Sequence, residues 1–200
     1  RARILHLCQR RALDIDRLGP KYVDQLMAAG LLREPADIFT LDRRRQEITA
    51  LPRWGEQSFA NLAAQLERAR RPGLAPFIYA LGIRGVGATI AADLARHFGS
   101  LERLAAAGEE ELQAIRGVGP EVSRSLLSFF ALPANREFLD RLARAGVRPR
   151  EEEARPRDRR LAGHNFCFTG RLERFTRQRA RELAEEAGAA TSGSVSGRTT

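Results

Sequence analysis

Apolar residues recur along this chain at the spacing of an α-helix, and each run begins three residues after a glycine. Counted from that glycine, the offsets +3, +4, +7, +8 and +11 are mostly apolar. The residues at these offsets are Tyr22, Val23, Leu26, Met27 and Gly30 in the first run, Ser58, Phe59, Leu62, Ala63 and Leu66 in the second, Ile90, Ala91, Leu94, Ala95 and Phe98 in the third, and Val122, Ser123, Leu126, Leu127 and Phe130 in the fourth. Such a stripe covers one face of a helix, so the pattern predicts four amphipathic helices.

The glycines that precede these runs mark an internal repeat. Gly19, Gly55, Gly87 and Gly119 are separated by 36, 32 and 32 residues, and a period of this size is typical of repeat architectures. Four positions before each glycine stands one more apolar residue, which we expect to end a preceding helix. These residues are Ile15, Leu51, Ile83 and Ile115. Each unit is then a helix, a tight turn and a second helix, and the predicted fold is mainly α with four tandem units.

The turns between the paired helices carry the candidate chemistry. The third and fourth turns are complete Gly-Val-Gly sequences, whereas Arg17 and Arg53 stand at the first glycine position of the other two. Glycine adopts positive φ without strain and lets a ligand approach the backbone. The helix that follows begins with N–H groups that have no partner, which makes its start an anion site. We therefore expect a Cβ to cause strain at the glycines of the two complete turns, and we expect the first two turns to bind anions less well.

Basic residues accompany these glycines, and a turn that binds one phosphate, used four times, suits a polyphosphate backbone. The alternative is that the glycines only form tight corners between helices, but four copies with the same offsets and flanking arginines favour phosphate binding. The candidate binding residues are Gly19, Lys21, Gly55, Arg84, Gly85, Gly87, Arg116, Gly117, Gly119 and Arg124.

These residues resemble the helix-hairpin-helix motif of DNA repair and replication proteins. Four units in a row, preceded by RILHLCQRRALDIDRLG, are similar to the region that follows the zinc finger in bacterial NAD-dependent DNA ligases, as are the segments LGIRGVG and IRGVGPEVSRSLLSFF. The resemblance covers nearly all 200 residues. The sequence departs from the motif at Arg17 and Arg53, and also at Phe59 and Ser123, where a small apolar residue is usual.

Further helices are expected around the repeats, over residues 1–12, from Pro35 with a cap from Glu34 or Asp37, and over 135–146. The helix of the second repeat is expected to span residues 56–70. The acidic run at residues 109–111 suits the start of a helix. Trp54 lies inside the second turn. It either stacks on a base or sugar or packs against a neighbouring repeat, and packing is the more usual role of a lone tryptophan there.

The sequence divides into three parts. Residues 1–147 hold the repeats, and residues 148–160 are charged, contain two prolines and are predicted to be a linker. In residues 161–200, a strand at 163–170, a helix capped by Thr176 and a second strand predict a parallel βαβ unit. This unit resembles the first half of a BRCT domain. The order of four helix-hairpin-helix units and a BRCT start is characteristic of the NAD-dependent ligase family.

Composition narrows the class of partner. The net charge is +9 and the sequence pI is about 11.0, which favours nucleic acid. The excess is spread, since residues 1–147 carry 22 basic and 17 acidic side chains. Cys8 and Cys167 are too few for a disulfide framework or a zinc site, and His6 has no partner at metal-ligand spacing, so no metal site is expected here.

The sequence also leads to expectations about the cell compartment and about whether the chain is part of a longer protein. No apolar run is long enough to cross a membrane, the N-terminus lacks the apolar core of a signal peptide, and we expect a cytoplasmic protein. The chain begins at Arg1 and ends at Thr200 inside an expected domain, so we expect a piece of a longer protein.

The resemblance implies a function. It implies the DNA-binding part of a ligase that seals single-strand nicks in duplex DNA during replication and repair, acting as a monomer through backbone contacts without sequence preference. NAD, Mg²⁺ and Zn²⁺ are implied for the parent protein, but no cofactor and no catalytic residue are expected here, because the family's nucleotidyl-transfer lysine motif has no counterpart and Lys21 follows a hairpin glycine. The alternatives are a non-catalytic binding module of an excision nuclease or Holliday-junction protein, and a protein-interaction scaffold.

Overall fold

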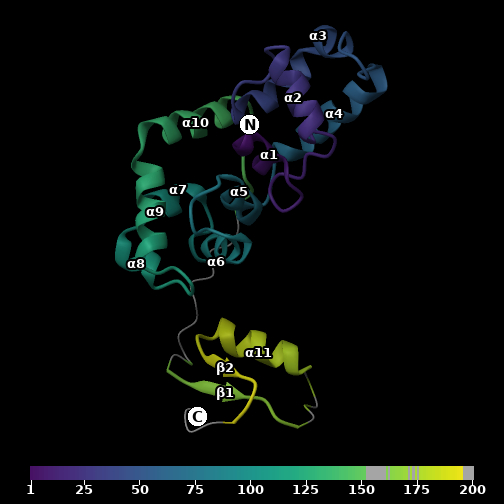
Figure 1. The fold of residues 1–200 in the computed structure, drawn as a ribbon. Helices are drawn as coiled ribbons and strands as arrows, with labels where there is room; N and C mark the ends of the chain where they lie inside the picture. Colours follow the sequence, from purple (N-terminus) through teal and green to yellow (C-terminus); the bar gives the residue numbers. More distant parts are fainter. Residues whose placement is uncertain (152–160, 162, 171, 173, 175, 196–200) are drawn as a thin grey trace. The chain divides into compact units, whose positions relative to one another are not determined.

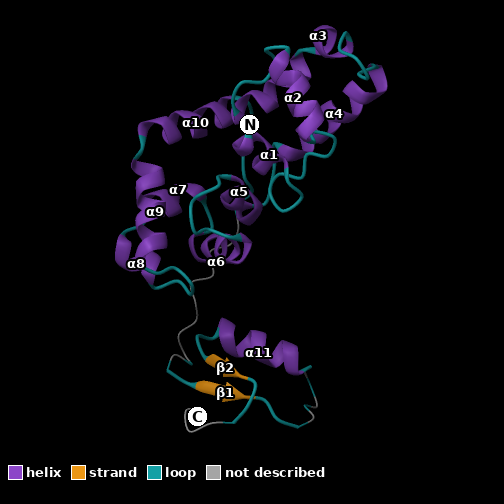
Figure 2. Cartoon of the chain, in the orientation of Figure 1, coloured by secondary structure: helices purple, strands orange, loops and turns teal. Residues whose placement is uncertain are grey.

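The chain forms two compact units, Arg1–Ala154 and Arg155–Thr200. The structure is a computed structural model that describes residues 1–151, 161, 163–170, 172, 174 and 176–195 (Figure 1). The described residues of the first unit form helices joined by turns and loops, and the second unit contains the two strands (Figure 2). The predicted fold class, mainly α and followed in the sequence by a short α/β segment, is confirmed.

Eleven helices make up the described part of the first unit. They are α1 (Ala2–Cys8), α2 (Pro20–Ala28), the 3₁₀ helix η1 (Pro35–Arg43), α3 (Arg45–Thr49), α4 (Glu56–Ala69), α5 (Leu74–Ala80), α6 (Ala88–Phe98), α7 (Leu101–Ala106), α8 (Glu109–Gln113), α9 (Pro120–Ala131) and α10 (Pro133–Arg144). The helix after each hairpin turn, namely α2, α4, α6 or α9, starts one residue beyond the repeat glycine.

The apolar stripe of each of these helices faces the core. The residue seven positions after the repeat glycine is at most 1% exposed in all four copies, at Leu26, Leu62, Leu94 and Leu126. Buried side chains of all four hairpins and of α1 and α10 belong to one continuous hydrophobic core. The spacing of apolar residues therefore predicts both the helices and the faces that they bury.

The expectation that the apolar anchor ends a helix is wrong. The helices α3, α5 and α8 end at Thr49, Ala80 and Gln113, two or three residues earlier, and residues 9–15 before the first turn contain no helix. The anchor starts the turn instead. In the last three units its carbonyl oxygen accepts the N–H group three residues later, as at Ile83, which accepts from Val86 at 3.0 Å. A carbonyl engaged in this turn is not available to continue a helix.

The other expected helices are present, although the first, expected over residues 1–12, ends at Cys8. Glu34 and Asp37 together form a capping box at the start of η1, the residues 109–111 form the first turn of α8, and the expected terminal helix is α10. Two backbone groups of the predicted linker are bound to the helical unit, since the N–H groups of Arg148 and Arg150 donate to the carbonyls of Arg70 and Pro72 at 2.7 and 2.8 Å. The rest of that linker, residues 152–160, lies outside the described residues.

The second unit contains the predicted βαβ arrangement. Strand β1 (Asn165–Cys167) pairs in parallel with β2 (Ala190–Ser192), and α11 (Arg177–Glu186) connects them. The side chain of Thr176 caps α11 by accepting the N–H of Arg179 at 3.1 Å. Strand β1 is shorter than the strand predicted at 163–170, and β2 is shorter than the strand predicted from the run AATSGSVS at 189–196. The last five residues lie outside the described part.

No helix among the described residues combines the length and the apolar character needed to cross a lipid bilayer.

Candidate nucleic-acid interface

All four hairpin turns share one unusual backbone conformation. At the first glycine position, φ is +68° for Arg17, +66° for Arg53, and +81° for both Gly85 and Gly117. Positive φ at the third residue of a turn is the requirement of a type II turn. A non-glycine residue in this region costs about 1–2 kcal/mol. The first two turns therefore share this positive φ with the other two, and the expectation that they bind anions less well stays a prediction.

The last glycine of each turn plays a different part. Gly19, Gly55, Gly87 and Gly119 are the N-caps of α2, α4, α6 and α9, with φ of −72°, −141°, −82° and −86°. No side chain caps these four helices, and a Cβ added at any of the four glycines would meet nothing within 4 Å. The expectation of backbone strain is therefore wrong for Gly87 and Gly119, because an N-cap residue is extended. It holds for Gly85 and Gly117.

The third and fourth turns pack against each other's helices. A Cβ on Gly85 would lie 3.0 Å from Cγ2 of Val122 in α9, and a Cβ on Gly117 would lie 3.6 Å from Cγ1 of Ile90 in α6. Ile90 and Val122 occupy the same offset from their repeat glycines. The two hairpins thus form a reciprocal pair, in which the first glycine of each turn leaves room for the partner helix.

The first and second hairpins also form a pair, held by polar contacts. Gln25 of α2 donates from Nε2 to the carbonyl of Pro52 at 2.9 Å and accepts the indole N–H of Trp54 at 3.0 Å. The rings of Tyr22 and Trp54 meet edge to face with centroids 5.1 Å apart. Trp54 is 7% exposed, so it packs against the neighbouring repeat and is not open for stacking on a base. The sequence pattern did not identify Gln25, whose offset carries no apolar signal.

The predicted basic residues lie on the surface around the turns. Lys21 is exposed in the first turn of α2 and Arg116 is exposed in the fourth hairpin. The side chain of Arg84 is 86% exposed and lies 3.4 Å from a carboxylate oxygen of Glu121. Arg124 donates to the carbonyl of Pro120 at 3.1 Å, and it lines a shallow depression together with Arg84 and Glu121. The third and fourth turns therefore bring Arg84 and Arg124 together, while Lys21 belongs to the other pair.

Arg17 and Arg53 are also surface residues of the turns, where the sequence showed them as flanking basic residues and as departures from the motif but not as candidate binding residues. Both side chains are exposed. Within the described part of the chain, neither guanidinium has a hydrogen-bond or ion-pair partner. The sequence signal that could have identified them as binding residues is an arginine, in each of two turns, at a position that favours glycine.

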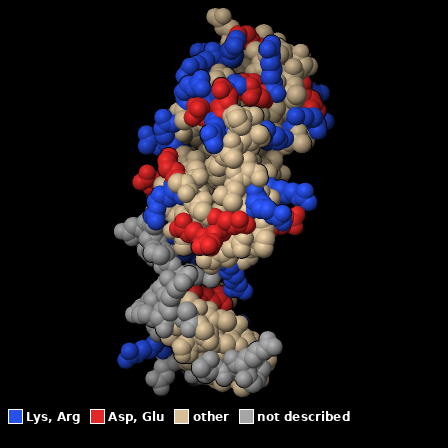
Figure 3. Space-filling view, turned by 90° about the vertical axis from the view of Figure 1, so that its left-hand side faces the viewer, with Lys and Arg blue, Asp and Glu red and all other residues tan. Residues whose placement is uncertain are grey.

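The charge on the surface is interspersed. On the face drawn in Figure 3, lysine and arginine side chains form several separate groups with acidic groups between them. The distribution agrees with the spread of charge along the sequence. Interspersed basic groups suit several separate contacts along a phosphate backbone better than they suit one deep anion-binding pocket.

The remaining titratable residues have structural surroundings. The ring of His6 hydrogen-bonds the carbonyl of Tyr79 at 2.8 Å, and burial raises the pKa of the Cys8 thiol to about 12. Among the residues that the structure describes, no group of three His, Cys, Asp or Glu side chains could hold a metal ion.

Comparison with family models places two known domain types on the chain. Residues 76–139 match the helix-hairpin-helix motif, and residues 156–200 match the BRCA1 C Terminus (BRCT) domain. The first match covers the reciprocal pair of the third and fourth hairpins. The chain thus contains a helix-hairpin-helix region, and a segment that matches the BRCT domain follows it in the sequence.

Curated proteins are similar to the chain over nearly its whole length. The chain is 43% identical over 198 residues to a DNA ligase of Heliobacterium modesticaldum, 48% over 193 residues to one of Methylococcus capsulatus and 46% over 197 residues to one of Alkalilimnicola ehrlichii. These alignments cover 96–98% of the chain but only 28–29% of each relative. Over nearly its whole length, the chain matches the C-terminal part of a bacterial DNA ligase.

Proposed function

We propose that this chain is the part of an NAD-dependent DNA ligase that holds duplex DNA, at a nick, by its phosphate backbone. The observation that carries the proposal is the repeated geometry of the turns. Each ends in a glycine N-cap with open space around its Cα, and no side chain caps the helix that follows. Each helix start thus offers free N–H groups and a positive dipole end to a phosphate.

The mode of binding follows from these groups. Backbone N–H groups and arginines bind phosphate oxygens, which position a protein on a duplex without reading bases. The arginines at the turns suit phosphate because the guanidinium presents a planar fork of donors. We propose that Gly19, Lys21, Gly55, Arg84, Gly85, Gly87, Arg116, Gly117, Gly119 and Arg124 form this surface, together with the side chains of Arg17 and Arg53.

The chemical step belongs to other parts of the parent protein. Nick sealing in this family needs a lysine that takes up adenylate from NAD, and the parent also needs Mg²⁺ and Zn²⁺. The described residues do not fit these groups, since they contain no metal-ligand cluster and Lys21, the single lysine, is exposed at a helix start. We propose that this chain acts as a monomeric clamp, in the cytoplasm where the chromosome lies, and that it supplies position only.

The chain alone should bind nicked duplex and seal nothing. We expect equal affinity for duplexes of one length and unrelated sequence, and no labelled adenylate on the protein after incubation with NAD, Mg²⁺ and nicked DNA. Fluorescence anisotropy measures the affinity for each duplex, and a gel assay for transferred label measures the adenylation of the protein. Strong discrimination between sequences would contradict backbone recognition, and an adenylate on Lys21 would contradict its assignment as a DNA contact.

A further inference from the structure

The last helix of the helical unit, α10, joins parts of the structure that lie far apart in the sequence. It follows α9 directly, with Leu132 as the cap of both helices. Two α10 side chains fix this joint, because Asn135 donates to the carbonyl of Phe129 at 3.1 Å and Arg136 donates to that of Phe130 at 2.8 Å. From there α10 runs back toward α1 (Figure 1), so it leads from the fourth hairpin to the first pair.

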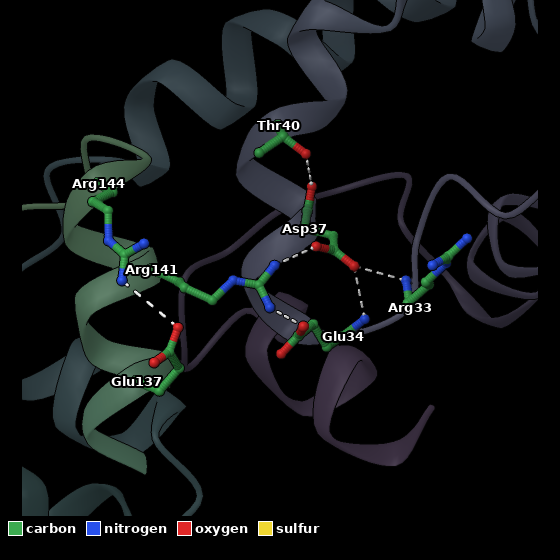
Figure 4. Close-up of polar contacts among 7 residues, drawn as sticks. All are labelled: Arg33, Glu34, Asp37, Thr40, Glu137, Arg141 and Arg144. Atoms are coloured by element: carbon green, nitrogen blue, oxygen red, sulfur yellow. Dashed lines mark hydrogen bonds and ion pairs between the residues drawn. The ribbon is translucent and has the colours of Figure 1, made fainter. Parts of the chain in front are cut away.

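At its far end, α10 is tied to η1 by an ion-pair cluster. The guanidinium of Arg141 donates to Oδ1 of Asp37 at 2.8 Å and to the carboxylate of Glu34 (Figure 4). Asp37 is itself fixed, since its Oδ2 accepts the backbone N–H groups of Arg33 and Glu34, each at 2.9 Å. The Arg141 side chain is 31% exposed and that of Asp37 is 20% exposed, so this contact is less screened by salt than a surface pair.

The residues just after α10 attach to the boundary between the two hairpin pairs. Arg70, the C-cap of α4, donates from Nε to the carbonyl of Ala145 at 3.0 Å and from its terminal nitrogen to Asp42 at 2.5 Å. Gly146 has a φ of +89° and lies so near Arg70 that a Cβ would be 3.4 Å from its Cδ. Arg70 and Arg141 therefore hold the same end of α10 from two directions.

We propose that Arg141 is a positioning residue: through α10 it fixes the third and fourth hairpins relative to the first and second. All four turns then contact one duplex at the same time. The duplex contact rests on the proposed function, whereas the fixed orientation of the two pairs does not. When two linked sites bind one ligand, the affinity depends on the effective concentration of the second site. A loosened joint lowers that concentration and leaves each pair's own binding unchanged.

The first test compares duplex lengths. One duplex has about two helical turns, or roughly 20 bp, and the other, about 8 bp, spans less than one turn and is closed by a loop. Arg141→Gln should lose about tenfold in affinity for the long duplex and nearly nothing beyond the loss of one charge for the short one. The matched control is Arg144→Gln, which removes the same charge from the same helix, where Arg144 lies 3.6 Å from Glu137 of α10. It should affect both lengths alike.

Glu34→Gln distinguishes a positioning role from an effect of net charge, because the two explanations predict opposite changes in affinity for the long duplex. Removing a carboxylate raises the net charge and should tighten binding to every duplex if charge alone matters. The amide oxygen still accepts the capping hydrogen bond at η1, so the fold should survive even if Arg141→Gln is unfolded. We expect weaker binding to the long duplex. Tighter binding at both lengths would overturn the proposal.

A second measurement decides the proposal without DNA. Spin labels at Ala64→Cys on α4 and Ser128→Cys on α9, both exposed positions, report the distance between the pairs after Cys167→Ser. Cys8 is buried with a raised pKa, so it should remain unlabelled. The distance distribution should broaden in Arg141→Gln and Glu34→Gln and stay narrow in Arg144→Gln. Narrow distributions in all three would overturn the positioning role, whereas absent DNA binding with a broadened distribution would refute only the proposed function.

Discussion

Gly85→Ala should destabilise the folded chain by about 2 kcal/mol or more, while the same change two residues later should leave it nearly as stable. Gly85 has a φ of +81°, and its Cβ would lie 3.0 Å from Cγ2 of Val122. A left-handed alanine costs about 1–2 kcal/mol, and forcing a methyl group into a packed contact costs about 1–3 kcal/mol more. Such a loss is a large share of the about 5–15 kcal/mol that stabilises a typical domain.

Gly87→Ala is the matched control, and its effect should appear in DNA binding. The residue is an extended N-cap with open space at its Cβ position, so folding should lose about 1 kcal/mol at most, from the poorer cap. The added methyl group occupies the space through which a phosphate would approach the helix start. Urea denaturation and duplex titration separate the two losses. Equal destabilisation by both variants would contradict the distinct roles assigned to the two glycines.

Replacing Arg17 and Arg53 by glycine should weaken DNA binding without loss of stability. Glycine relieves the left-handed strain at these positions, and this gain is partly offset by its greater freedom in the unfolded chain. Each lost guanidinium–phosphate contact should lower the salt slope of binding by about 0.9, which corresponds to roughly eightfold in affinity at 0.1 M salt. The double variant should therefore be at least as stable as the parent chain and bind DNA about 60-fold less tightly.

The control for this pair is Arg68→Gln, which also removes a positive charge. Arg68 is exposed in the last turn of α4, about 20 Å along the helix from the turn. It should lower affinity slightly. If Arg53→Gly and Arg68→Gln have the same small effect, the turn arginines do not contact phosphate.

The sequence was sufficient to predict the helices and their buried faces. A fixed set of apolar offsets after a glycine specifies one face of a helix, and the structure buries Leu26, Leu62, Leu94 and Leu126 at the same offset. The βαβ order of the second unit followed equally from local signals, such as the Thr176 cap. Local sequence patterns suffice to predict an element when the residues that specify it lie close together in the sequence.

Backbone angles and contacts between residues distant in the sequence were the features that the sequence predicted wrongly or not at all. Two glycines of one turn look alike in a sequence, yet Gly85 is left-handed and Gly87 extended, because the first lies inside the turn and the second caps the helix. The cluster of Arg141 with Glu34 and Asp37 spans more than 100 residues, and no periodicity indicates such a contact. The sequence therefore predicted the candidate turns but not how they are held together.

The most direct test of the account is the salt dependence of duplex binding by this chain. If four turns each neutralise about one phosphate, log K should fall with log salt at a slope of roughly −3 to −4, and steeper if Arg17 and Arg53 add their own contacts. The slope should become shallower when Gly87→Ala and Gly119→Ala are combined. A slope near zero in the parent chain would contradict the claim that the hairpin turns bind a phosphate backbone.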